Sequence, residues 1–240
     1  MNEPFLSVIV PAYNEANRLG STLEKIVSWL RIQNYASEVV VVDDGSTDAT
    51  VEVAKNKLAG FHHVVLLNGI NQGKGYSVKQ GMLAGKGKVL LFTDADLSTP
   101  IEECARFLKL LEQGPYDCVI ASRALPGAQI EIHQNALREL MGRVFNKIAS
   151  CLSFKGISDS QCGFKCFSQK AAKDLFSRQK LKGFSFDAEI LFLAQKLGYR
   201  VLETPVIWRN SAQSRVRMIS DPLAMFSDLV RMRWIHRDLG

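Results

Sequence analysis

The regular alternation of strand-like and helix-like segments between residues 6 and 121 constrains the fold more than any other feature of this chain. Short apolar runs rich in β-branched residues are typical of buried strands, and they recur at residues 6–10, 38–43, 63–67, 88–92 and 116–121. Segments with apolar residues at helical spacing, or with helix-start signals, separate these runs. The alternation predicts an α/β fold in which a mainly parallel sheet is covered by helices on both faces.

The pattern changes after Ser122. The elements predicted beyond it are a loop (126–134), an amphipathic helix (137–152), a loop with a short strand (156–167), a helix (188–197), a strand (200–208) and a basic amphipathic helix (221–237). No internal repeat, low-complexity tract or Pro/Ser-rich linker interrupts the sequence. We therefore expect a single domain over residues 1–240.

The charge of the chain favours an anionic partner. Its 240 residues include 30 Lys and Arg against 24 Asp and Glu, a net charge of +6 that suits nucleotide phosphates, a lipid phosphate, an anionic membrane or nucleic acid. We expect no nucleic acid, because the basic residues do not alternate with aromatic residues as base-stacking platforms require. No stretch approaches the ~20 apolar residues of a membrane-spanning helix, and no signal peptide precedes the first strand, so a cytoplasmic protein is expected.

Polar residues gather where three of the predicted strands end. The clusters are Tyr13-Asn14-Glu15, Asp43-Asp44-Gly45-Ser46 and Asp94-Ala95-Asp96. Ligands of doubly wound sheets bind beyond the carboxyl ends of the strands. All three clusters should therefore meet at one binding edge.

Asp94 and Asp96 are candidate metal ligands. Two carboxylates one residue apart at a strand end repel each other unless a cation lies between them. Hard oxygen ligands suit Mg²⁺ or Mn²⁺, which are commonly shared with substrate phosphates. The same pair would also be compatible with solvated loop aspartates, or with helix caps before Pro100.

Two further segments carry weaker signals. Asp43 can accept hydrogen bonds from a ribose hydroxyl or a base N–H, although Asp-Gly-Ser is equally good turn chemistry. Gly73-Lys74-Gly75 is compatible with a phosphate-binding turn, in which glycines admit the ligand and Lys74 supplies a charge. It is not a Walker A loop, because Tyr76 and Ser77 follow the second glycine.

Taken together, these segments resemble a known family. The successive motifs of family 2 glycosyltransferases, which have the GT-A fold, are similar in letters, order and spacing to Val8-Ile-Val-Pro-Ala-Tyr-Asn-Glu15, Val41-Val-Asp-Asp-Gly-Ser-Thr-Asp48 and Thr93-Asp-Ala-Asp96. Four later segments resemble the polyprenyl-phosphate glycosyltransferases, the branch of dolichyl-phosphate mannose synthases and β-glucosyltransferases: Asn71-Gln-Gly-Lys-Gly75, Ala121-Ser-Arg123, Asp159-Ser-Gln-Cys-Gly-Phe-Lys165 and Phe184-Ser-Phe-Asp-Ala-Glu189.

The resemblance implies a nucleotide-sugar-binding half at residues 1–122. The residues that would line the base and ribose are Pro11, Tyr13, Glu15 and Asp43. Asp94 and Asp96 would contact the donor diphosphate through the metal, with Lys74 as the basic residue of the second loop. A divalent metal, Mg²⁺ or Mn²⁺, is the implied cofactor.

An acceptor-binding half is implied at residues 123–240. Arg123 and Arg138 match basic positions that face the acceptor phosphate in this branch, and Asp159 matches a carboxylate near the reacting carbon. These three residues, with Asp96, are the implied catalytic residues. An acceptor hydroxyl would need a base, for which Asp159 is the candidate, whereas an acceptor phosphate is already anionic.

The implied reaction is an inverting transfer of a hexose from a nucleotide sugar to a polyprenyl phosphate. The Asp-x-Gln-Cys-Gly-Phe-Lys segment favours UDP-glucose over GDP-mannose as donor. Mannose synthases often have Gln where this chain has Ser98 and Ser where it has Gly142, which weakens the assignment to mannose. A family 2 transferase that acts on a saccharide or another lipid is also compatible with these motifs, and so is a nucleotide-binding regulatory protein.

Two predicted helices could lie on an anionic membrane surface. The apolar stripe of helix 137–152 is flanked by Arg and Lys, and helix 221–237 has Leu223, Phe226, Val230 and Trp234 at near-helical spacing beside arginines. Both stripes could instead pack on the catalytic domain or form a dimer interface. We expect a peripheral protein on the cytosolic face of a membrane.

Overall fold

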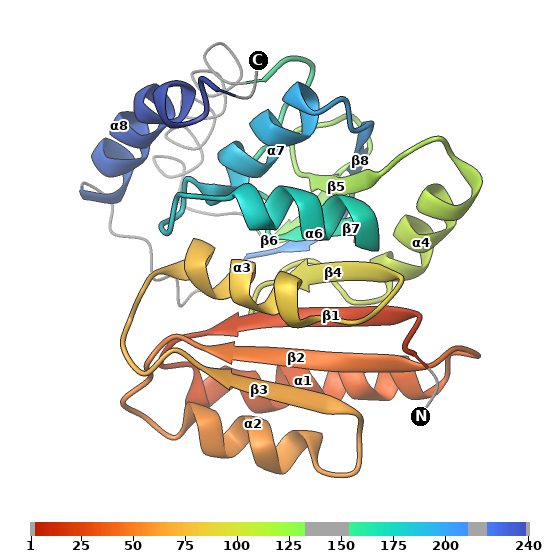
Figure 1. Cartoon of the computed structure of the whole chain (residues 1–240). Helices are drawn as coiled ribbons and strands as arrows, with labels where there is room; N and C mark the ends of the chain where they lie inside the picture. The colour runs from red at the N-terminus through yellow and green to blue at the C-terminus, as the bar shows by residue number, and fades with distance from the viewer. Residues whose placement is uncertain (1–2, 133–153, 211–219, 239–240) are drawn as a thin grey trace.

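A single seven-stranded sheet forms the centre of the molecule. The computed structural model describes residues 3–132, 154–210 and 220–238. The strand order is β3-β2-β1-β4-β7-β5-β8 (Figure 1). The strands are β1 (Leu6–Ala12), β2 (Ser37–Asp43), β3 (His63–Leu67), β4 (Val89–Thr93), β5 (Cys118–Ser122), β7 (Phe164–Ser168) and β8 (Val201–Pro205). The sheet thus takes strands from both sides of residue 122.

Strand β7 runs against its neighbours. It pairs antiparallel with β4, where Phe92 lies opposite Lys165, and antiparallel with β5, where Val119 lies opposite Cys166. The other pairings of this sheet are parallel, so the prediction of a mainly parallel sheet is confirmed. Because β7 is reversed, its first residue lies at the edge where the parallel strands end. The chain before Phe164 is therefore delivered to the same edge as the polar clusters.

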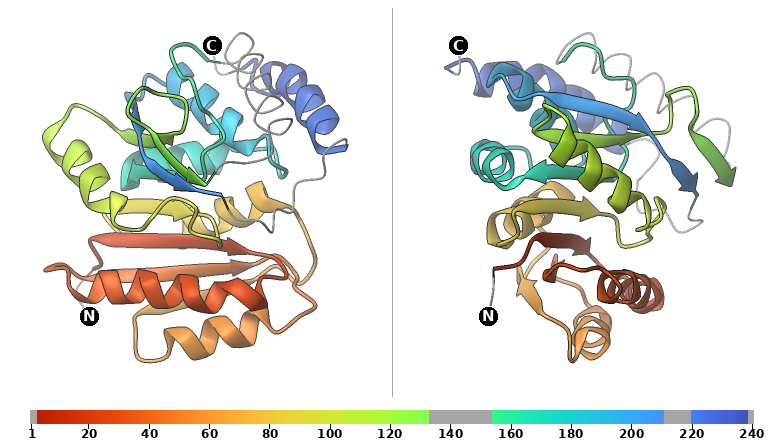
Figure 2. Two further views of the ribbon diagram at one scale, coloured as in Figure 1. Left: turned by 180° about the vertical axis from the view of Figure 1, so that it is seen from behind. Right: turned by 90° about the vertical axis from the view of Figure 1, so that its right-hand side faces the viewer.

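Helices cover both faces of the sheet, as expected (Figure 2). One face packs against α1 (Ala16–Arg31), α2 (Thr50–Leu58) and α4 (Glu103–Gln113), and the other against α3 (Lys74–Ala84), α6 (Gln169–Arg178) and α7 (Phe186–Lys196). Alternate residues of one strand point to opposite faces, so Val8 and Val10 belong to the first core and Ile9 to the second. All three side chains are fully buried, which explains why β1 has no polar face.

Several predictions for the second half need correction. The expected loop at 126–134 contains β6 (Gln129–Ile132), which pairs with β9 (Ile207–Arg209) in a small separate sheet. The expected strand 200–208 is divided at Val206 into β8, which ends at Pro205, and β9; proline has no N–H to continue a strand ladder. Helix α6 was not predicted. Its start is capped by Ser168, whose hydroxyl accepts a hydrogen bond from Ala171 N.

The two candidate membrane helices have different outcomes. Helix α8 (Ser220–Ile235) forms close to the expected 221–237. The predicted helix 137–152 lies outside the described residues. Within the described residues, no helix is long and apolar enough to cross a membrane.

Candidate active site

The end of β2 carries a buried carboxylate with an unused oxygen. Asp43 is 3% exposed, and its Oδ2 accepts hydrogen bonds from Gly45 N (3.1 Å) and Ser46 N (3.0 Å). Its Oδ1 is buried and has no hydrogen-bond partner within the described chain. Buried carboxylate oxygens are normally hydrogen-bonded, so Oδ1 has the geometry of an acceptor reserved for a ligand. Turn chemistry and a ligand contact are compatible at this residue because each uses a different oxygen.

The neighbouring carboxylate has a structural role. Asp44 Oδ1 accepts hydrogen bonds from Gln72 N (3.0 Å) and Asn68 Nδ2 (2.8 Å), and Oδ2 accepts one from Gly73 N (2.8 Å). It thereby ties the end of β2 to the loop that leads into α3. The loop that carries Lys74 is anchored at its start by this aspartate.

The turn after β1 is held in an unusual backbone conformation. Asn14 has a φ of 52°, and it is fixed by Ser46 Oγ, which accepts from Asn14 N (2.8 Å), and by Thr47 N, which donates to Asn14 Oδ1 (2.8 Å). Left-handed conformations in residues other than glycine are concentrated at functional sites. This turn presents Tyr13, which is 37% exposed, beside the end of β2, whereas Pro11 is buried within β1.

Arg18 connects the turn after β1 to the end of β4. Its guanidinium donates to both carboxylate oxygens of Glu15, and its Nη1 lies 3.7 Å from Asp96 Oδ2. Although burial opposes the charged form, the hydrogen bond and charge of Glu15, together with Asp96, raise the pKa of Arg18. The sequence motifs did not single out Arg18. The sequence did contain one indication of this ion pair: Arg18 lies three residues after Glu15 at the start of a helix, a spacing at which side chains meet.

The turn after β4 contains the two candidate metal ligands. Leu97 has a φ of 49°, and its N donates to Asp94 O (3.0 Å), which closes a tight turn around Asp96. Asp96 Oδ1 accepts a hydrogen bond from Ser98 N (3.1 Å). A positive φ at a bulky residue is strained, and the packing of Leu97 against the core maintains it.

The charges around Asp94 and Asp96 suit a cation. Burial first, and then the charge of Asp94, raise the pKa of Asp96. Lys74 Nζ lies 2.6 Å from Asp94 Oδ1, so one positive group already faces the pair. No group of three or more His, Cys, Asp or Glu that could hold a metal occurs among the described residues. An ion here would thus have at most two protein carboxylates from that part of the chain, and its remaining ligands would be substrate oxygens and water, as is usual for Mg²⁺.

On the acceptor side, Arg123 and Asp159 form a bidentate ion pair. Arg123 Nε and Nη2 lie 2.7 and 2.8 Å from the two carboxylate oxygens, and Arg123 N donates to Oδ2 (2.9 Å). Asp159 is 1% exposed, which alone would favour its neutral form, but the charge and hydrogen bonds of Arg123 lower its pKa to about 2. The Arg123 guanidinium also lies 5.5 Å from the Trp208 ring centroid. The pair uses Nε and Nη2 of the guanidinium, and within the described residues no hydrogen bond uses Nη1, which suits a second anion.

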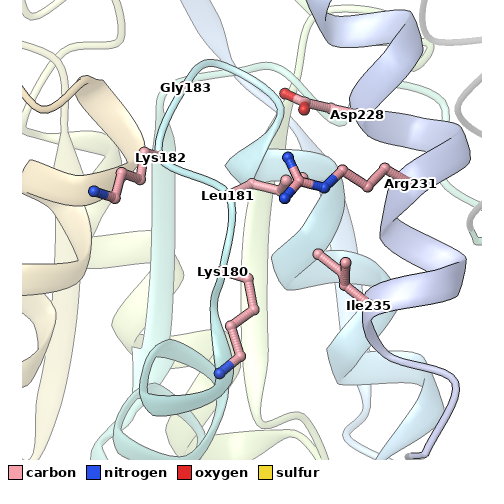
Figure 3. Close-up of a pocket in the computed structure, with 7 residues that line it drawn as sticks. All are labelled: Lys180, Leu181, Lys182, Gly183, Asp228, Arg231 and Ile235. Carbon is pink, nitrogen blue, oxygen red and sulfur yellow. The ribbon is translucent and has the colours of Figure 1, made fainter.

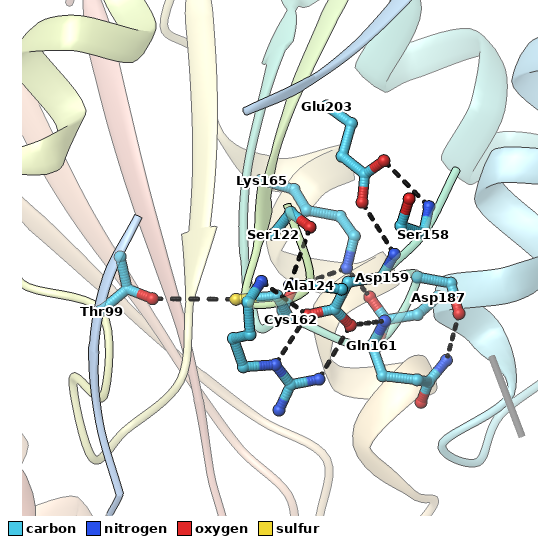
Figure 4. A network of polar contacts seen from close by, with 12 residues as sticks. Thr99, Ser122, Ala124, Ser158, Asp159, Gln161, Cys162, Lys165, Asp187 and Glu203 are labelled. Atoms are coloured by element: carbon cyan, nitrogen blue, oxygen red, sulfur yellow. Dashed lines mark hydrogen bonds and ion pairs between the residues drawn. The ribbon is translucent and has the colours of Figure 1, made fainter. Parts of the chain in front are cut away.

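A network beneath this pair fixes the segment before β7 (Figure 4). Glu203 on β8 accepts hydrogen bonds from Ser158 N (2.9 Å) and Asp159 N (2.7 Å). Lys165 is fully buried, where its Nζ donates to Cys162 O (2.7 Å) and pairs with Asp187 on α7. Neither Lys165 nor Glu203 was recognised in the sequence as a support for the site.

The structure therefore brings most of the predicted residues to one edge of the sheet. Hydrogen bonds or ion pairs connect Glu15 to Asp96 through Arg18, Lys74 to Asp94, and Arg123 to Asp159. Both carboxylate oxygens of Asp159 bind Arg123, so this residue is not an unengaged general base. Arg138 lies outside the described residues.

Comparison with known proteins places this geometry in a family. Residues 7–176 match the family described as "Glycosyl transferase family 2". Proteins named dolichyl-phosphate beta-glucosyltransferase are similar over almost the whole chain. The one from Dictyostelium discoideum is 34% identical and matches 96% of this chain and 74% of its own length. The human one is 33% identical, with 96% and 76% covered. The one from Drosophila melanogaster is 35% identical, with 98% and 76% covered.

Solved structures share the fold at lower sequence identity. Mannosyl-3-phosphoglycerate synthase from Rubrobacter xylanophilus superposes with a TM-score of 0.71 at 20% identity, covering 98% of this chain and 75% of that one. Glucosyl-3-phosphoglycerate synthase from Mycobacterium tuberculosis, solved with Mn²⁺, UDP-glucose and phosphoglyceric acid, superposes with a TM-score of 0.70 at 19% identity, covering 99% and 80%. The expected fold and family are confirmed. The chain belongs to glycosyltransferase family 2, in the branch of the dolichyl-phosphate β-glucosyltransferases.

Proposed function

We propose that the protein transfers glucose from UDP-glucose to a polyprenyl phosphate, with inversion at the anomeric carbon. The relatives that match nearly the whole chain are named for this class of reaction. The observation that carries the proposal is the Arg123–Asp159 pair. It fixes the orientation of a guanidinium that can bond an acceptor phosphate, and it keeps the Asp159 carboxylate ionised, on the same sheet edge as Asp94 and Asp96.

The donor base and ribose would lie against the turns after β1 and β2. Asp43 Oδ1 is buried and accepts no hydrogen bond from the described residues. It could accept one from a ribose hydroxyl or a base N–H. Tyr13 is exposed at the rim and Pro11 and Glu15 are buried beside it. All four residues lie at or just after the ends of the paired strands β1 and β2. The UDP bound in the solved glucosyl-3-phosphoglycerate synthase supports a uridine nucleotide.

A divalent metal fits the donor site. Asp96 has a raised pKa and lies close to Asp94, and the described residues offer no group of three possible metal ligands. These features suit an ion that is also coordinated by a diphosphate. Such an ion supplies electrostatic stabilisation of the departing nucleoside diphosphate. Lys74 would supply a second positive charge on the same group. Related structures contain Mn²⁺ or Mg²⁺ with UDP.

Arg123 and Arg138 would bind the acceptor phosphate. Arginine suits this role because its planar fork can bond a carboxylate and still direct an N–H toward a phosphate oxygen. Asp159 would then orient Arg123 and remain a negatively charged carboxylate near the reacting groups. A carboxyl group with a pKa of about 2 accepts protons poorly near neutral pH, which argues against an acceptor hydroxyl and agrees with an acceptor phosphate that is already ionised.

An anionic membrane surface is the proposed location of the acceptor. Phe226, Val230 and Trp234 lie on one outward face of α8, where they are 49%, 58% and 69% exposed. Arg233 and Arg237 lie close by, and the Arg237 guanidinium is 5.1 Å from the Trp234 ring centroid. Exposed aromatics beside arginines are typical of helices that lie in the interface of an anionic, cytosolic leaflet.

The function is tested by measuring nucleoside diphosphate release from a panel of sugar donors. With Mg²⁺ or Mn²⁺ and a polyprenyl phosphate in detergent, UDP-glucose should support release, and the lipid product should contain one β-linked glucose. GDP-mannose should support far slower turnover. Turnover with a saccharide acceptor but not with polyprenyl phosphate, or a preference for GDP-mannose, would refute the proposal.

A further inference from the structure

The turn that carries Lys74 rests on a second segment that is distant in sequence. Lys182 O accepts a hydrogen bond from Tyr76 N (3.1 Å), and Gln179 Nε2 donates to Gly75 O (2.9 Å). A Cβ at Gly73 would come within 2.6 Å of Lys182 O, and one at Gly75 within 2.8 Å of Gly183 O. Both glycines are thus required by this close approach. The backbone of residues 180–183 forms the wall against which Lys74 is placed.

One buried carboxylate holds that wall. Glu189 on the first turn of α7 has no exposed surface, and its Oε1 and Oε2 accept hydrogen bonds from Lys180 N and Leu181 N, each 2.8 Å. Its Oε1 also lies 2.6 Å from Nε2 of His236, the residue after α8. Hydrogen bonds to a buried carboxylate are strong, and an N–H left unpaired beside it is costly.

The opposite side of the segment is open. A pocket of about 530 Å³ separates residues 180–183 from α8, and Asp228, Arg231 and Ile235 line its far wall (Figure 3). The ammonium of Lys182 turns away from this pocket toward α3, where it bonds Gln72 Oε1 (3.0 Å). Because the pocket lies on the α8 side, the segment is held from within the domain. Glu189 binds its two N–H groups, Gln179 Nε2 donates to Leu181 O (2.7 Å), and Tyr76 N donates to Lys182 O (3.1 Å).

We propose that Glu189 is a positioning residue for Lys74, and hence for the donor diphosphate. It acts through residues 180–183, which set the place of Gly73 and Gly75 on either side of Lys74. The inference rests on the proposed function, because it takes Lys74 to contact the diphosphate. Loss of the Glu189 contacts should weaken donor binding and leave acceptor binding unchanged.

The matched control is a second buried glutamate at the other edge of the sheet. Glu38 is 1% exposed and accepts hydrogen bonds from Ser7 Oγ and Lys86 N, both 2.6 Å. It lies near the start of β2, whereas the site lies beyond the strand's end. In Glu189→Gln the amide NH2 cannot accept, so one of the two backbone N–H groups loses its partner, because Lys180 N and Leu181 N bond different oxygens. In Glu38→Gln the remaining carbonyl oxygen can accept from both Ser7 Oγ and Lys86 N, since both bond the same oxygen, so this variant controls for the loss of a buried negative charge. Both variants remove a buried negative charge, but only Glu189→Gln should weaken binding of the nucleotide-sugar donor.

The experiment is equilibrium binding of UDP-glucose with Mn²⁺ to the wild type, Glu189→Gln, Glu38→Gln and Lys74→Ala. We expect about tenfold weaker donor binding for Glu189→Gln and no change for Glu38→Gln. In a Lys74→Ala background, Glu189→Gln should cause little further loss, because its effect passes through Lys74. If Glu189→Gln does not fold, Glu189→Asp, which is one methylene too short to hold both N–H groups, is expected to show the same dependence on Lys74.

The outcomes separate this inference from the proposed function. If the wild type binds no UDP-sugar, the proposed function fails. If the wild type binds UDP-glucose and Glu189→Gln binds it equally well, the positioning role is wrong. Equal losses in Glu38→Gln and Glu189→Gln, or full additivity with Lys74→Ala, would show that Glu189 only stabilises the fold.

Discussion

Gly163 lies so close to Asp94 that any side chain at this position would collide with the Asp94 carboxylate. The two residues are also joined through the backbone, because Asp94 N donates to Gly163 O (3.2 Å). Strand β7, which begins at Phe164, is reversed relative to β4, so its preceding residue comes directly beside the end of β4. The glycine therefore leaves the space that a candidate metal ligand occupies.

Gly163→Ala should displace the Asp94 carboxylate and leave the sheet in place. The φ of Gly163 is outside the left-handed region, so alanine causes no backbone strain and the penalty comes from the contact with Asp94. We expect a loss of at least about tenfold in the affinity for Mn²⁺ with UDP, and a fall of about 1–3 kcal/mol in the free energy of unfolding. Isothermal titration and chemical denaturation measure the two effects. Unchanged Mn²⁺ affinity would contradict the assignment of Asp94.

Asp96→Asn tests the need for a charged metal ligand. The substitution keeps the shape and the bond from Ser98 N, but it removes the repulsion with Asp94 and half of the carboxylate charge available to an ion. Turnover should fall by about two orders of magnitude or more, with little change in melting temperature. The wild type should likewise be inactive in excess EDTA and recover when Mg²⁺ or Mn²⁺ is added. Full activity in excess EDTA would show that no metal is used, and full activity of Asp96→Asn would show that Asp96 is not a required ligand.

The Arg123–Asp159 pair makes a prediction about pH. The folded-state pKa of Asp159 is lowered from 3.8 to about 2, so its contribution to stability is complete above pH ~4 and is lost as the pH falls toward 2. Between pH ~5 and ~2.5 the wild type should lose about 2 kcal/mol more stability than Asp159→Asn, which has no proton to take up at this position. Thermal unfolding at a series of pH values measures the difference. Parallel curves for the two proteins would mean that the pair is not formed in solution.

The same variant tests the role of Asp159 in the reaction. Without its anchor, Arg123 loses its fixed orientation, so Asp159→Asn should raise the acceptor KM or lower kcat by about tenfold or more while donor affinity is retained. Arg123→Lys should have a similar effect, because a single ammonium cannot hold the carboxylate and bind the phosphate as a fork does. A loss confined to stability would leave Asp159 as a structural residue only.

The sequence was sufficient to predict the sheet of parallel strands and the carboxylates at its edge. Strand periodicity places Asp43 and Asp94 at strand ends, and parallel strands end together. The antiparallel orientation of β7 was not predictable in the same way, because the short apolar run of Phe164–Ser168 does not indicate whether the strand runs parallel or antiparallel to its neighbours. For the same reason Gly163 and Lys165 could be quoted as part of a motif, but their contacts with Asp94 and Asp187 could not be deduced. Contacts between segments distant in sequence depend on topology, which the local pattern does not contain.

Helix α8 has two distinct faces, and the outer one makes the last prediction. Leu229 and Met232 of α8, with His236 just after it, are buried against the domain. Phe226, Val230 and Trp234 form an exposed apolar row. A row of this kind is costly in water, since each side chain gains on the order of 1 kcal/mol or more when it is transferred to an apolar phase. An anionic membrane would bury the row and also attract the arginines beside it.

Phe226→Glu combined with Trp234→Glu should therefore abolish binding to anionic vesicles. The wild type should co-sediment with vesicles that contain phosphatidylglycerol at low salt, and less with pure phosphatidylcholine or at high salt, because salt screens the attraction. The charge-matched control is Ile32→Glu with Leu67→Glu, two apolar residues that are 79% and 58% exposed elsewhere on the surface. The α8 pair should lose more than about tenfold in vesicle affinity and the control pair much less, because only the α8 row enters the membrane. Equal losses would mean that net charge alone drives binding, and conversion of a dimer to a monomer by the α8 pair, without loss of vesicle binding, would identify the row as a subunit interface.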